Sequence, residues 1–446
     1  MTIVERIYRN SLQFPDKPAI VCNDTILSYS NLWHKILESA NSILEKYPKG
    51  SRITYKASLS ESFVAQYFGI HLAQCVNVPV DNDISSDRFL EICNEIKFNN
   101  LPPIFNFLKD NLVFPDEDLN ADIMFTTGTT GKPKGVLLSH KNLCCAVDNI
   151  NAFIGNNVDD VELIALPLAH SFGLGRLRCV LSKGGTAVLF NGFANVKKLF
   201  ESIENHHCTG FAFVPAAWNY IQRISGDKIS KFASQLRYIE IGSSYMSVES
   251  KQKLMSLLPN TRICMHYGLT EASRSTFLSF FDDKEHLNSI GKPAQNTAIK
   301  VFEDGEIGVK GQHVFHKYLN DVPADFRDSY FLTGDCGKID ENGYIYLTGR
   351  KKEIINVGGK KVSPIEVESV LNTFPAIVES CCVGVQDDVY GEVVKAYIVV
   401  NKEFDNTLLR KFLKDKLETY KIPSSFQIVD SLPKTKSGKI QRLELK

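Results

Sequence analysis

One ten-residue segment between two short strand-like runs constrains this chain more than any other feature. The runs cover residues 122–125 and 136–140. Between them the chain places Thr126, Thr127, Gly128, Thr129, Thr130, Gly131, Lys132, Pro133, Lys134 and Gly135. Successive backbone N–H groups in such a loop form a concave site for an anion, while hydroxyl and ammonium groups add donors and positive charge. The segment therefore predicts a loop that binds a polyphosphate.

Two other interpretations of this loop are weaker. A P-loop requires G-x-x-x-x-G-K-[S/T] before a helix, but Thr126 occupies the place of its first glycine and Pro133 the place of its Ser or Thr. Pro133 also removes a backbone donor. An ordinary flexible turn rarely combines four threonines, three glycines and two lysines in ten residues. We therefore expect a phosphate loop that is not of the Walker type.

The composition excludes several classes of protein. Lys+Arg and Asp+Glu both number 51 among 446 residues, so no net field attracts nucleic acid or an anionic membrane. No apolar run approaches the ~20 residues of a membrane span, and the first residues lack the apolar core of a signal peptide. The 11 cysteines lack metal-ligand spacing and suit buried positions in a reducing compartment. We expect a cytoplasmic protein with no nucleic-acid partner and no membrane span.

Hydrophobic periodicity predicts an α/β fold. Strands are expected at 51–57, 75–80, 162–167, 210–215 and 238–244, with helices such as 29–44, 60–73 and 85–97 between some of them. This alternation favours a parallel sheet flanked by helices. From 290 to 347 the period becomes two, with an Asn-Gly turn, which indicates an antiparallel β region. We expect a large N-terminal α/β domain, residues 1–349, ending in this β-rich subdomain, and a small C-terminal α+β domain, residues 350–446.

The threonine- and glycine-rich loop resembles the phosphate-loop signature of the adenylate-forming superfamily, which includes acyl- and aryl-CoA ligases, peptide-synthetase adenylation domains and luciferases. The resemblance spans residues from about 120 to the end, with the main motifs in order. It implies ATP and Mg²⁺ as cofactors and a small-molecule carboxylic acid as substrate. It further implies coenzyme A, or the phosphopantetheine of an acyl-carrier protein, as acyl acceptor. Residues 98–120 look loop-like where the family has a further strand and helix, so the chain resembles a short member.

The resemblance also implies a mobile C-terminal domain, with a hinge near 350–352 and Lys352 at the hinge position. The active site would lie in the cleft between the two domains. Within the phosphate loop, residues 126–131 and Lys134 would contact the nucleotide, and Thr127 would also take part in catalysis. A non-catalytic scaffold that keeps the fold and binds nucleotide is the alternative from another class of protein.

A second motif comprises Tyr267, Gly268, Leu269, Thr270 and Glu271. By resemblance, Tyr267 stacks on adenine and Glu271 holds Mg²⁺ against the phosphates, with Gly268 and Thr270 also beside the nucleotide. A carboxylate is the hard oxygen donor that Mg²⁺ prefers. Gly242 and Ser243 end a buried strand in small residues. Such an end lets a ligand approach the backbone closely, at the edge where open α/β sheets bind ligands.

A third motif runs from Tyr330 to Asp335 and is followed by Arg350. By resemblance, Asp335 accepts both ribose hydroxyls and Arg350 accompanies it on the nucleotide. Near the C-terminus, Lys439 resembles the lysine that bridges the carboxylate and the α-phosphate. A compact, mobile ammonium suits this role because it neutralises the charge that develops there.

The paired glycines Gly358 and Gly359 resemble the acyl-CoA ligase version of their segment, in which bare backbone lines the pantetheine tunnel. A plain turn at a strand end is the alternative. His170 matches an aromatic residue or histidine at the mouth of the acid pocket in the family. We assign it a gating role and no acid–base role.

The stretch 168–175 bears on the identity of the acid because it contains no carboxylate. Peptide-synthetase domains hold an α-ammonium with an aspartate here, and burying an unpaired ammonium is costly. The predicted substrate is therefore an aryl or fatty acid without an α-amino group. Arg176, Arg178 and Arg274 lie close in sequence, and one that reached the pocket would favour a second carboxylate or a hydroxyl on the substrate, which would resemble o-succinylbenzoate–CoA ligase. Each arginine singly is more expected to face solvent or pair elsewhere.

Overall fold

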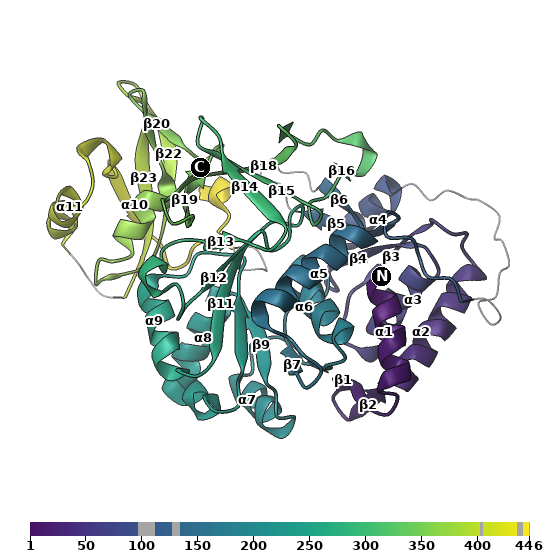
Figure 1. Cartoon of the computed structure of the whole chain (residues 1–446). Helices are drawn as coiled ribbons and strands as arrows, with labels where there is room; N and C mark the ends of the chain where they lie inside the picture. Colours follow the sequence, from purple (N-terminus) through teal and green to yellow (C-terminus); the bar gives the residue numbers. More distant parts are fainter. Residues whose placement is uncertain (97–111, 127–133, 402–404, 435–439, 446) are drawn as a thin grey trace.

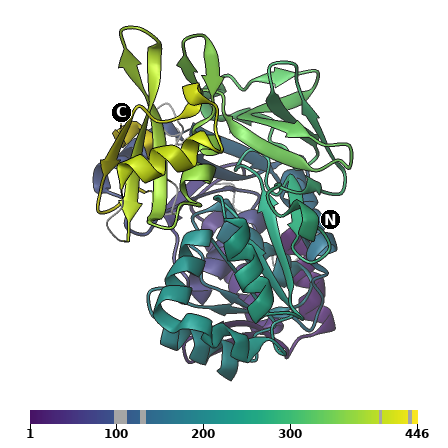
Figure 2. The ribbon, with the colours of Figure 1, turned by 90° about the vertical axis from the view of Figure 1, so that its left-hand side faces the viewer.

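The computed structural model describes residues 1–96, 112–126, 134–401, 405–434 and 440–445. A large body with two sheets forms most of the chain, while an antiparallel sheet and a C-terminal unit lie together at one end of it (Figures 1 and 2). Among the described helices, none is long and apolar enough to cross a membrane.

The larger sheet has nine strands in the order β13-β12-β11-β10-β9-β7-β8-β1-β2. Their bounds are β1 Pro18–Cys22, β2 Thr25–Ser28, β7 Val161–Ile164, β8 Thr186–Leu189, β9 Gly210–Phe213, β10 Tyr238–Ile241, β11 Arg262–Tyr267, β12 Thr276–Ser279 and β13 Lys292–Pro293. The central strands from β11 to β1 run parallel, while β2, β12 and β13 are antiparallel to their neighbours. The predicted parallel sheet is therefore present, with antiparallel edges.

A second sheet has five strands in the order β16-β6-β5-β4-β3. Their bounds are β3 Arg52–Lys56, β4 Val76–Val80, β5 Asn120–Thr126, β6 Lys134–Ser139 and β16 Lys317–Tyr318. The strands expected at 51–57 and 75–80 thus belong to a different sheet from β1. Local periodicity does not show which sheet a strand joins. β5 and β6 form an antiparallel pair that holds both ends of the predicted phosphate loop, with Thr126 opposite Lys134.

Helices pack between and around these two sheets (Figure 1). Their bounds are α1 Ile3–Gln13, α2 Tyr29–Leu44, α3 Glu61–Leu72, α4 Ser86–Glu95, α5 His140–Ile154, α6 Ser171–Ser182, α7 Val196–Asn205, α8 Pro215–Ser225 and α9 Val248–Leu257. One hydrophobic core joins α1, α2, α3, α5 and α6 to strands of both sheets, and a second lies under α7, α8 and α9. α5 begins at a capping box formed by Ser139 and Asn142 and ends at Gly155, whose φ of 76° is left-handed.

The predicted β-rich region forms a third sheet, in the order β14-β15-β18-β17 with β19 paired to β18. Its strands are β14 Thr297–Val301, β15 Glu306–Gly311, β17 Phe326–Arg327, β18 Tyr330–Ile339 and β19 Ile345–Arg350. All of its pairings are antiparallel, as the period of two predicts. Asp335 on β18 and Arg350 on β19 are direct partners in this register.

The C-terminal unit has its own sheet, in the order β21-β20-β23-β22 with β24 beside β23. Its elements are β20 Ile355–Val357, β21 Lys360–Val362, α10 Pro364–Leu371, β22 Ile377–Asp387, β23 Gly391–Val400, α11 Asn406–Lys414 and β24 Ser425–Ile428. A separate hydrophobic core fills this unit. β19 ends at Arg350 and β20 belongs to another sheet, so the chain passes between the two sheets just after the boundary that we propose between residues 349 and 350.

Candidate active site

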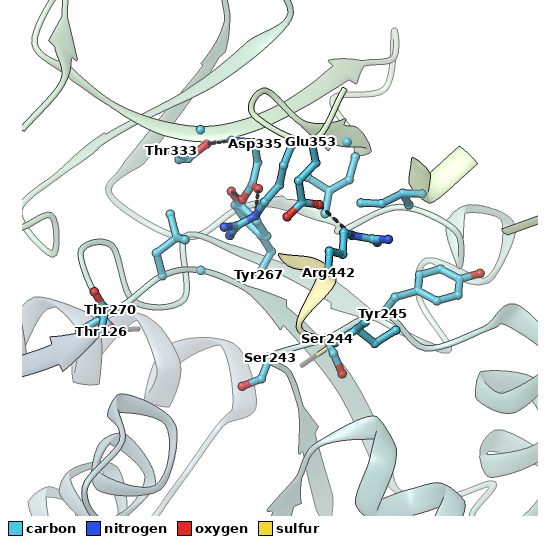
Figure 3. Close-up of a pocket in the computed structure, with 18 of the residues that line it drawn as sticks. Thr126, Ser243, Ser244, Tyr245, Tyr267, Thr270, Thr333, Asp335, Glu353 and Arg442 are labelled. Carbon is cyan, nitrogen blue, oxygen red and sulfur yellow. Dashed lines mark hydrogen bonds and ion pairs between the residues drawn. The ribbon is translucent and has the colours of Figure 1, made fainter. Parts of the chain in front are cut away.

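A large cleft lies where the two α/β sheets, the antiparallel sheet and the C-terminal unit meet. Its volume is about 2490 Å³, and its walls include the ends of β10 and β11, parts of β18 and β19, and residues of α10 and β22. Figure 3 shows side chains from these elements converging on the cleft, with Tyr267 and Asp335 on one wall and Glu353 and Arg442 beside them. Motifs that are far apart in the sequence therefore share one site.

Asp335 stands at the centre of a hydrogen-bonded group. The Tyr267 hydroxyl donates to Asp335 Oδ2 at 2.7 Å, and Arg350 Nε lies 2.9 Å from Oδ1. The backbone N–H of Asp335 donates to Thr333 Oγ1 at 3.1 Å. Burial, and then the Asp335 carboxylate, raise the pKa of Tyr267 well above its usual value, so the phenol remains a donor. The three residues predicted for the nucleoside are thus in direct contact.

We expect Asp335→Asn to raise the KM for ATP roughly 10- to 100-fold, because the carboxamide replaces a charged acceptor at this contact. Steady-state pyrophosphate release at varied ATP measures the effect. Asp148→Asn is the matched control, since Asp148 pairs with Arg6 and neither residue lines the cleft. An unchanged KM for ATP in Asp335→Asn would refute the nucleoside role.

Glu271 and Lys134 meet at one aromatic side chain. The Tyr318 hydroxyl donates to Glu271 Oε1 at 2.9 Å, and Lys134 Nζ lies 4.9 Å from the centre of the Tyr318 ring. Since β16 pairs with β6, Tyr318 holds the second motif against the base of the phosphate loop. The described residues contain no cluster of three metal-ligating side chains. Mg²⁺ commonly uses one or two carboxylates together with substrate phosphates, so Glu271 alone suits that role.

The small residues at the ends of β10 and β11 meet steric demands of the chain itself. A Cβ on Gly242 would lie 2.1 Å from Cε1 of His266, and one on Gly268 would lie 2.4 Å from the backbone nitrogen of Arg274. Ser243 has a φ of 76°, an unusual conformation for a residue with a side chain. Strain of this kind clusters at functional sites, and both Ser243 and Thr270 line the cleft.

His170 lies at the N-terminal end of α6 and lines the cleft. Its Nε2 atom is 3.3 Å from Asp81 Oδ1. The contact joins α6 to the segment after β4, at the side of the cleft where the acid was predicted. Its gating role stays a prediction.

The three arginines of the acid stretch are buried and paired with carboxylates. Arg176 contacts Glu162 and Glu240, Arg274 contacts Glu240, and Arg178 contacts Asp122. None of the three lines the large cleft. They therefore pair elsewhere, as was expected for each one singly, and none is positioned to hold a second substrate carboxylate.

The predicted hinge and glycine pair lie in different surroundings. Lys352 lines the cleft next to Arg350. Gly358 and Gly359 form the tight β20–β21 turn with φ of 56° and 83°, and the Gly358 N–H donates to Tyr390 O at 2.8 Å. Neither glycine lines the cleft in this arrangement, so the tunnel role stays a prediction.

Several predicted site residues lie outside the described part of the chain. They are Thr127, Gly128, Thr129, Thr130, Gly131 and Lys439. Their roles stay predictions, and the structure describes only the residues on either side of them. Thr126 and Lys134 bracket the loop across one strand pair, and Lys434 and Ile440 bridge the two ends of the segment that carries Lys439.

Two sequence profiles match the chain: AMP-binding enzyme over residues 98–319 and AMP-binding enzyme C-terminal domain over residues 366–439. The 2-succinylbenzoate–CoA ligase of Staphylococcus aureus strain MRSA252 is 31% identical over 344 residues, which cover 75% of this chain and 68% of the relative. The chain belongs to the AMP-binding enzyme family. Another member, the 2-succinylbenzoate–CoA ligase of Bacillus licheniformis, is 33% identical over 342 residues, covering 73% of this chain and 69% of the relative.

Solved structures of AMP-binding enzymes share the fold. The o-succinylbenzoate CoA synthetase of Bacillus subtilis, in complex with its acyl-adenylate intermediate, has a TM-score of 0.87 and 26% identity, covering 99% of this chain and 97% of that one. The same enzyme has been solved with ATP and a magnesium ion. ATP-bound MatB from Rhodopseudomonas palustris matches in fold, with a TM-score of 0.87 and 24% identity. The match covers 100% of this chain and 98% of the MatB chain. The predicted superfamily, fold class, cofactors and AMP-forming acid–CoA ligase class are confirmed.

The sequence alone did not indicate some residues of this AMP-binding enzyme's cleft. They are Tyr318, His266, Glu353 and Arg442, together with Glu240 behind the wall. Glu240 offered a signal, since it is a single acidic residue inside an otherwise apolar strand, where a charge is expected only if it is paired.

Proposed function

We propose that this acid–CoA ligase converts an aryl or fatty carboxylic acid without an α-amino group to acyl-AMP, releasing pyrophosphate, and then transfers the acyl group to the thiol of coenzyme A. One observation carries the proposal. The contacts among Tyr267, Asp335 and Arg350 lie in the same cleft as Glu271. This arrangement gathers a nucleoside anchor and a hard oxygen ligand at the carboxyl ends of the sheet strands.

Each residue has a defined part in this reaction. Asp335 accepts hydrogen bonds from the ribose, held in place by Tyr267 and Arg350. Glu271 would hold Mg²⁺, which neutralises phosphate charge when bound. Lys439 would place an ammonium beside the attacking carboxylate oxygen and the α-phosphate. The attack on the α-phosphorus joins two anions, so fixed positive charge at this point lowers the barrier most.

The absence of an α-amino group is tested with matched substrate pairs. We expect faster pyrophosphate release with phenylpropanoic or cinnamic acid than with phenylalanine, and with a medium-chain fatty acid than with leucine. Glu240 is already held by two arginines and Asp81 contacts His170, so an ammonium buried here would lack a dedicated partner. A clear preference for the amino acids would contradict the proposal.

o-Succinylbenzoate is a second candidate acid, favoured by the names of the two curated ligases and by the Bacillus subtilis complex. It has a second carboxylate. Including it in the same panel, with hydroxamate trapping of the acyl-adenylate, compares it directly with the simple aryl and fatty acids.

Coenzyme A is proposed as the acceptor, with a carrier-protein phosphopantetheine as the alternative. If Gly358 and Gly359 line the thiol tunnel, Gly359→Leu should block thioester formation while sparing ATP–pyrophosphate exchange. No atom lies within 4 Å of a Cβ placed on Gly359, so the added side chain meets open space in this arrangement. Its φ of 83° adds backbone strain, and Gly359→Ala is therefore the control, because it carries that strain without the bulk. A normal thioester rate in Gly359→Leu would rule out the tunnel.

The domain division and the location in the cell belong to the same proposal. We place the boundary between residues 349 and 350, the hinge at Lys352, and the protein in the cytoplasm. All 11 cysteines are free, nine of them buried and only Cys93 and Cys145 partly exposed. Free thiols in such number suit a reducing compartment.

A further inference from the structure

His266 presents an imidazole ring to the acid side of the cleft. Successive residues of a strand point to opposite faces, so Tyr267 turns toward Asp335 while His266 turns the other way. There its ring meets Phe172 of α6 edge-on, with the two centres 4.7 Å apart. His266 is 9% exposed, and it is among the residues that line the cleft. Phe172 lies two residues after His170, so the ring borders the region predicted to take the acid.

The charges behind the ring determine its protonation. His266 Nδ1 lies 2.6 Å from Oε1 of the fully buried Glu240. Arg176 and Arg274 each contact Glu240 at 3.1 Å, and Arg176 also contacts Glu162. These contacts keep the pKa of Glu240 well below its usual range despite burial. Two arginines thus balance two carboxylates, and burial lowers the pKa of His266, so the ring is neutral.

A neutral ring in this setting favours one tautomer. Glu240 Oε1 can only accept and lies 2.6 Å from Nδ1, so the carboxylate attracts the ring proton to Nδ1, although the N–H is not aimed well enough to form a hydrogen bond. Nε2 then keeps its lone pair. The ring occupies the space that a side chain at Gly242 would fill, with Nε2 2.3 Å from the position of a Cβ there. Gly242 therefore makes room for the ring at the cleft. Within the described residues, no protein hydrogen bond involves Nε2.

We infer that His266 determines specificity: its Nε2 accepts a hydrogen bond from a hydroxyl group on the acid, so the preferred substrate is a hydroxylated aryl or acyl carboxylic acid. The inference rests on the proposed function and narrows its substrate class. A site built around a buried acceptor rejects analogues that lack the donor, since the acceptor is then left unpaired. A second ionised carboxylate on the substrate would be repelled by the Nε2 lone pair, because both groups can only accept. The inferred substrate therefore differs from o-succinylbenzoate.

The test uses matched sets of acids on the full-length protein. Each set contains a hydroxy acid, its deoxy analogue and its fluoro analogue at the same position, built on benzoic acid, cinnamic acid and a medium-chain fatty acid. Fluorine keeps the polarity and nearly the size of the hydroxyl but donates no hydrogen bond. We expect at least one hydroxy acid to exceed both of its analogues roughly 10- to 100-fold in kcat/KM for pyrophosphate release.

His266→Phe provides the matching variant. Phenylalanine keeps a ring against Phe172, and Glu240 keeps both arginines, so no buried charge is orphaned. The preference for the hydroxy acid should vanish, while turnover of the deoxy acid changes only a few-fold. The control is His286→Phe. His286 stacks on Tyr344 outside the cleft lining, and its loss should leave the preference intact.

Three results would overturn the inference: equal use of hydroxy and fluoro acids by the wild type, a preference that survives in His266→Phe, or o-succinylbenzoate exceeding every hydroxy acid. The wild-type comparison decides the matter even if His266→Phe fails to fold. If fluoro, deoxy and hydroxy acids are activated equally, the ligase proposal stands and only the role of His266 fails. If no acid of any class supports the release of pyrophosphate from ATP, the ligase proposal fails, and this inference fails with it.

Discussion

Replacing Lys439 by alanine is expected to slow acyl-adenylate formation by roughly 10²- to 10³-fold, the loss typical of removing a group that stabilises transition-state charge. The same variant should largely retain thioester formation from supplied acyl-adenylate and coenzyme A. In that second step no phosphate is attacked by a carboxylate, so the ammonium has no developing charge to neutralise. ATP–pyrophosphate exchange and a thioester assay measure the two steps separately.

The control for this variant is Lys414→Ala, an exposed lysine on α11 of the same unit, which should leave both steps unchanged. Equal losses of Lys439→Ala in the two half-reactions would argue against a C-terminal domain that brings Lys439 to the cleft for the first step only. They would indicate that the lysine supports the structure of the C-terminal unit.

The second large effect is expected at Arg442. Its guanidinium makes a bidentate pair with Glu368 of α10, and Nε lies 2.9 Å from Glu353 Oε2 just after the proposed hinge. Nη1 also donates to the carbonyl oxygen of Cys382 at 3.2 Å. Arg442 therefore joins the end of the chain to the post-hinge turn, α10 and β22. Burial raises the pKa of the Glu368 carboxyl, although Arg442 opposes this shift.

Arg442→Ala should destabilise the C-terminal unit by about 3–5 kcal/mol, because it leaves a buried carboxylate without its partner. Urea unfolding followed by probes in each unit measures the change. Arg410→Ala is the control. Arg410 donates hydrogen bonds to the carbonyl oxygens of Pro423 and Ser424 and lies over the Phe426 ring, and the structure describes no carboxylate partner for it. The double variant Arg442→Leu with Glu368→Leu should recover part of the loss. A small effect of Arg442→Ala would show that solvent already screens the pair.

Local patterns predicted the elements and motif positions well. The period of two after residue 290 corresponds to an antiparallel sheet. Asp335 and Arg350 were named from motif order, and the β18–β19 register brings them into contact. These features depend on residues close in sequence or on short sequence motifs that can be recognised without knowing the fold.

Long-range pairing could not be predicted in the same way. Nothing local separates β3 and β4 from the sheet of β1, because strand partners depend on the packing of distant helices. Glu240 and Arg176 are 64 residues apart, and Arg178 and Asp122 are 56 apart. Their pairing appears only when β10, α6 and β5 are placed together. The position of His266 is equally hidden in the sequence, since only Glu240, Phe172 and Gly242 give its ring a defined role.

The placement of the 11 thiols has a practical consequence for observing this enzyme at work. Since only Cys93 and Cys145 are partly exposed, replacing these two with serine would leave nine buried thiols that react slowly with maleimide dyes. New cysteines could then be introduced at Leu12 on the large body and Val389 on the C-terminal unit, two residues that are 65% and 81% exposed, respectively. Single-molecule fluorescence transfer between dyes at these two points would follow the C-terminal unit as acid, ATP and coenzyme A are added in turn.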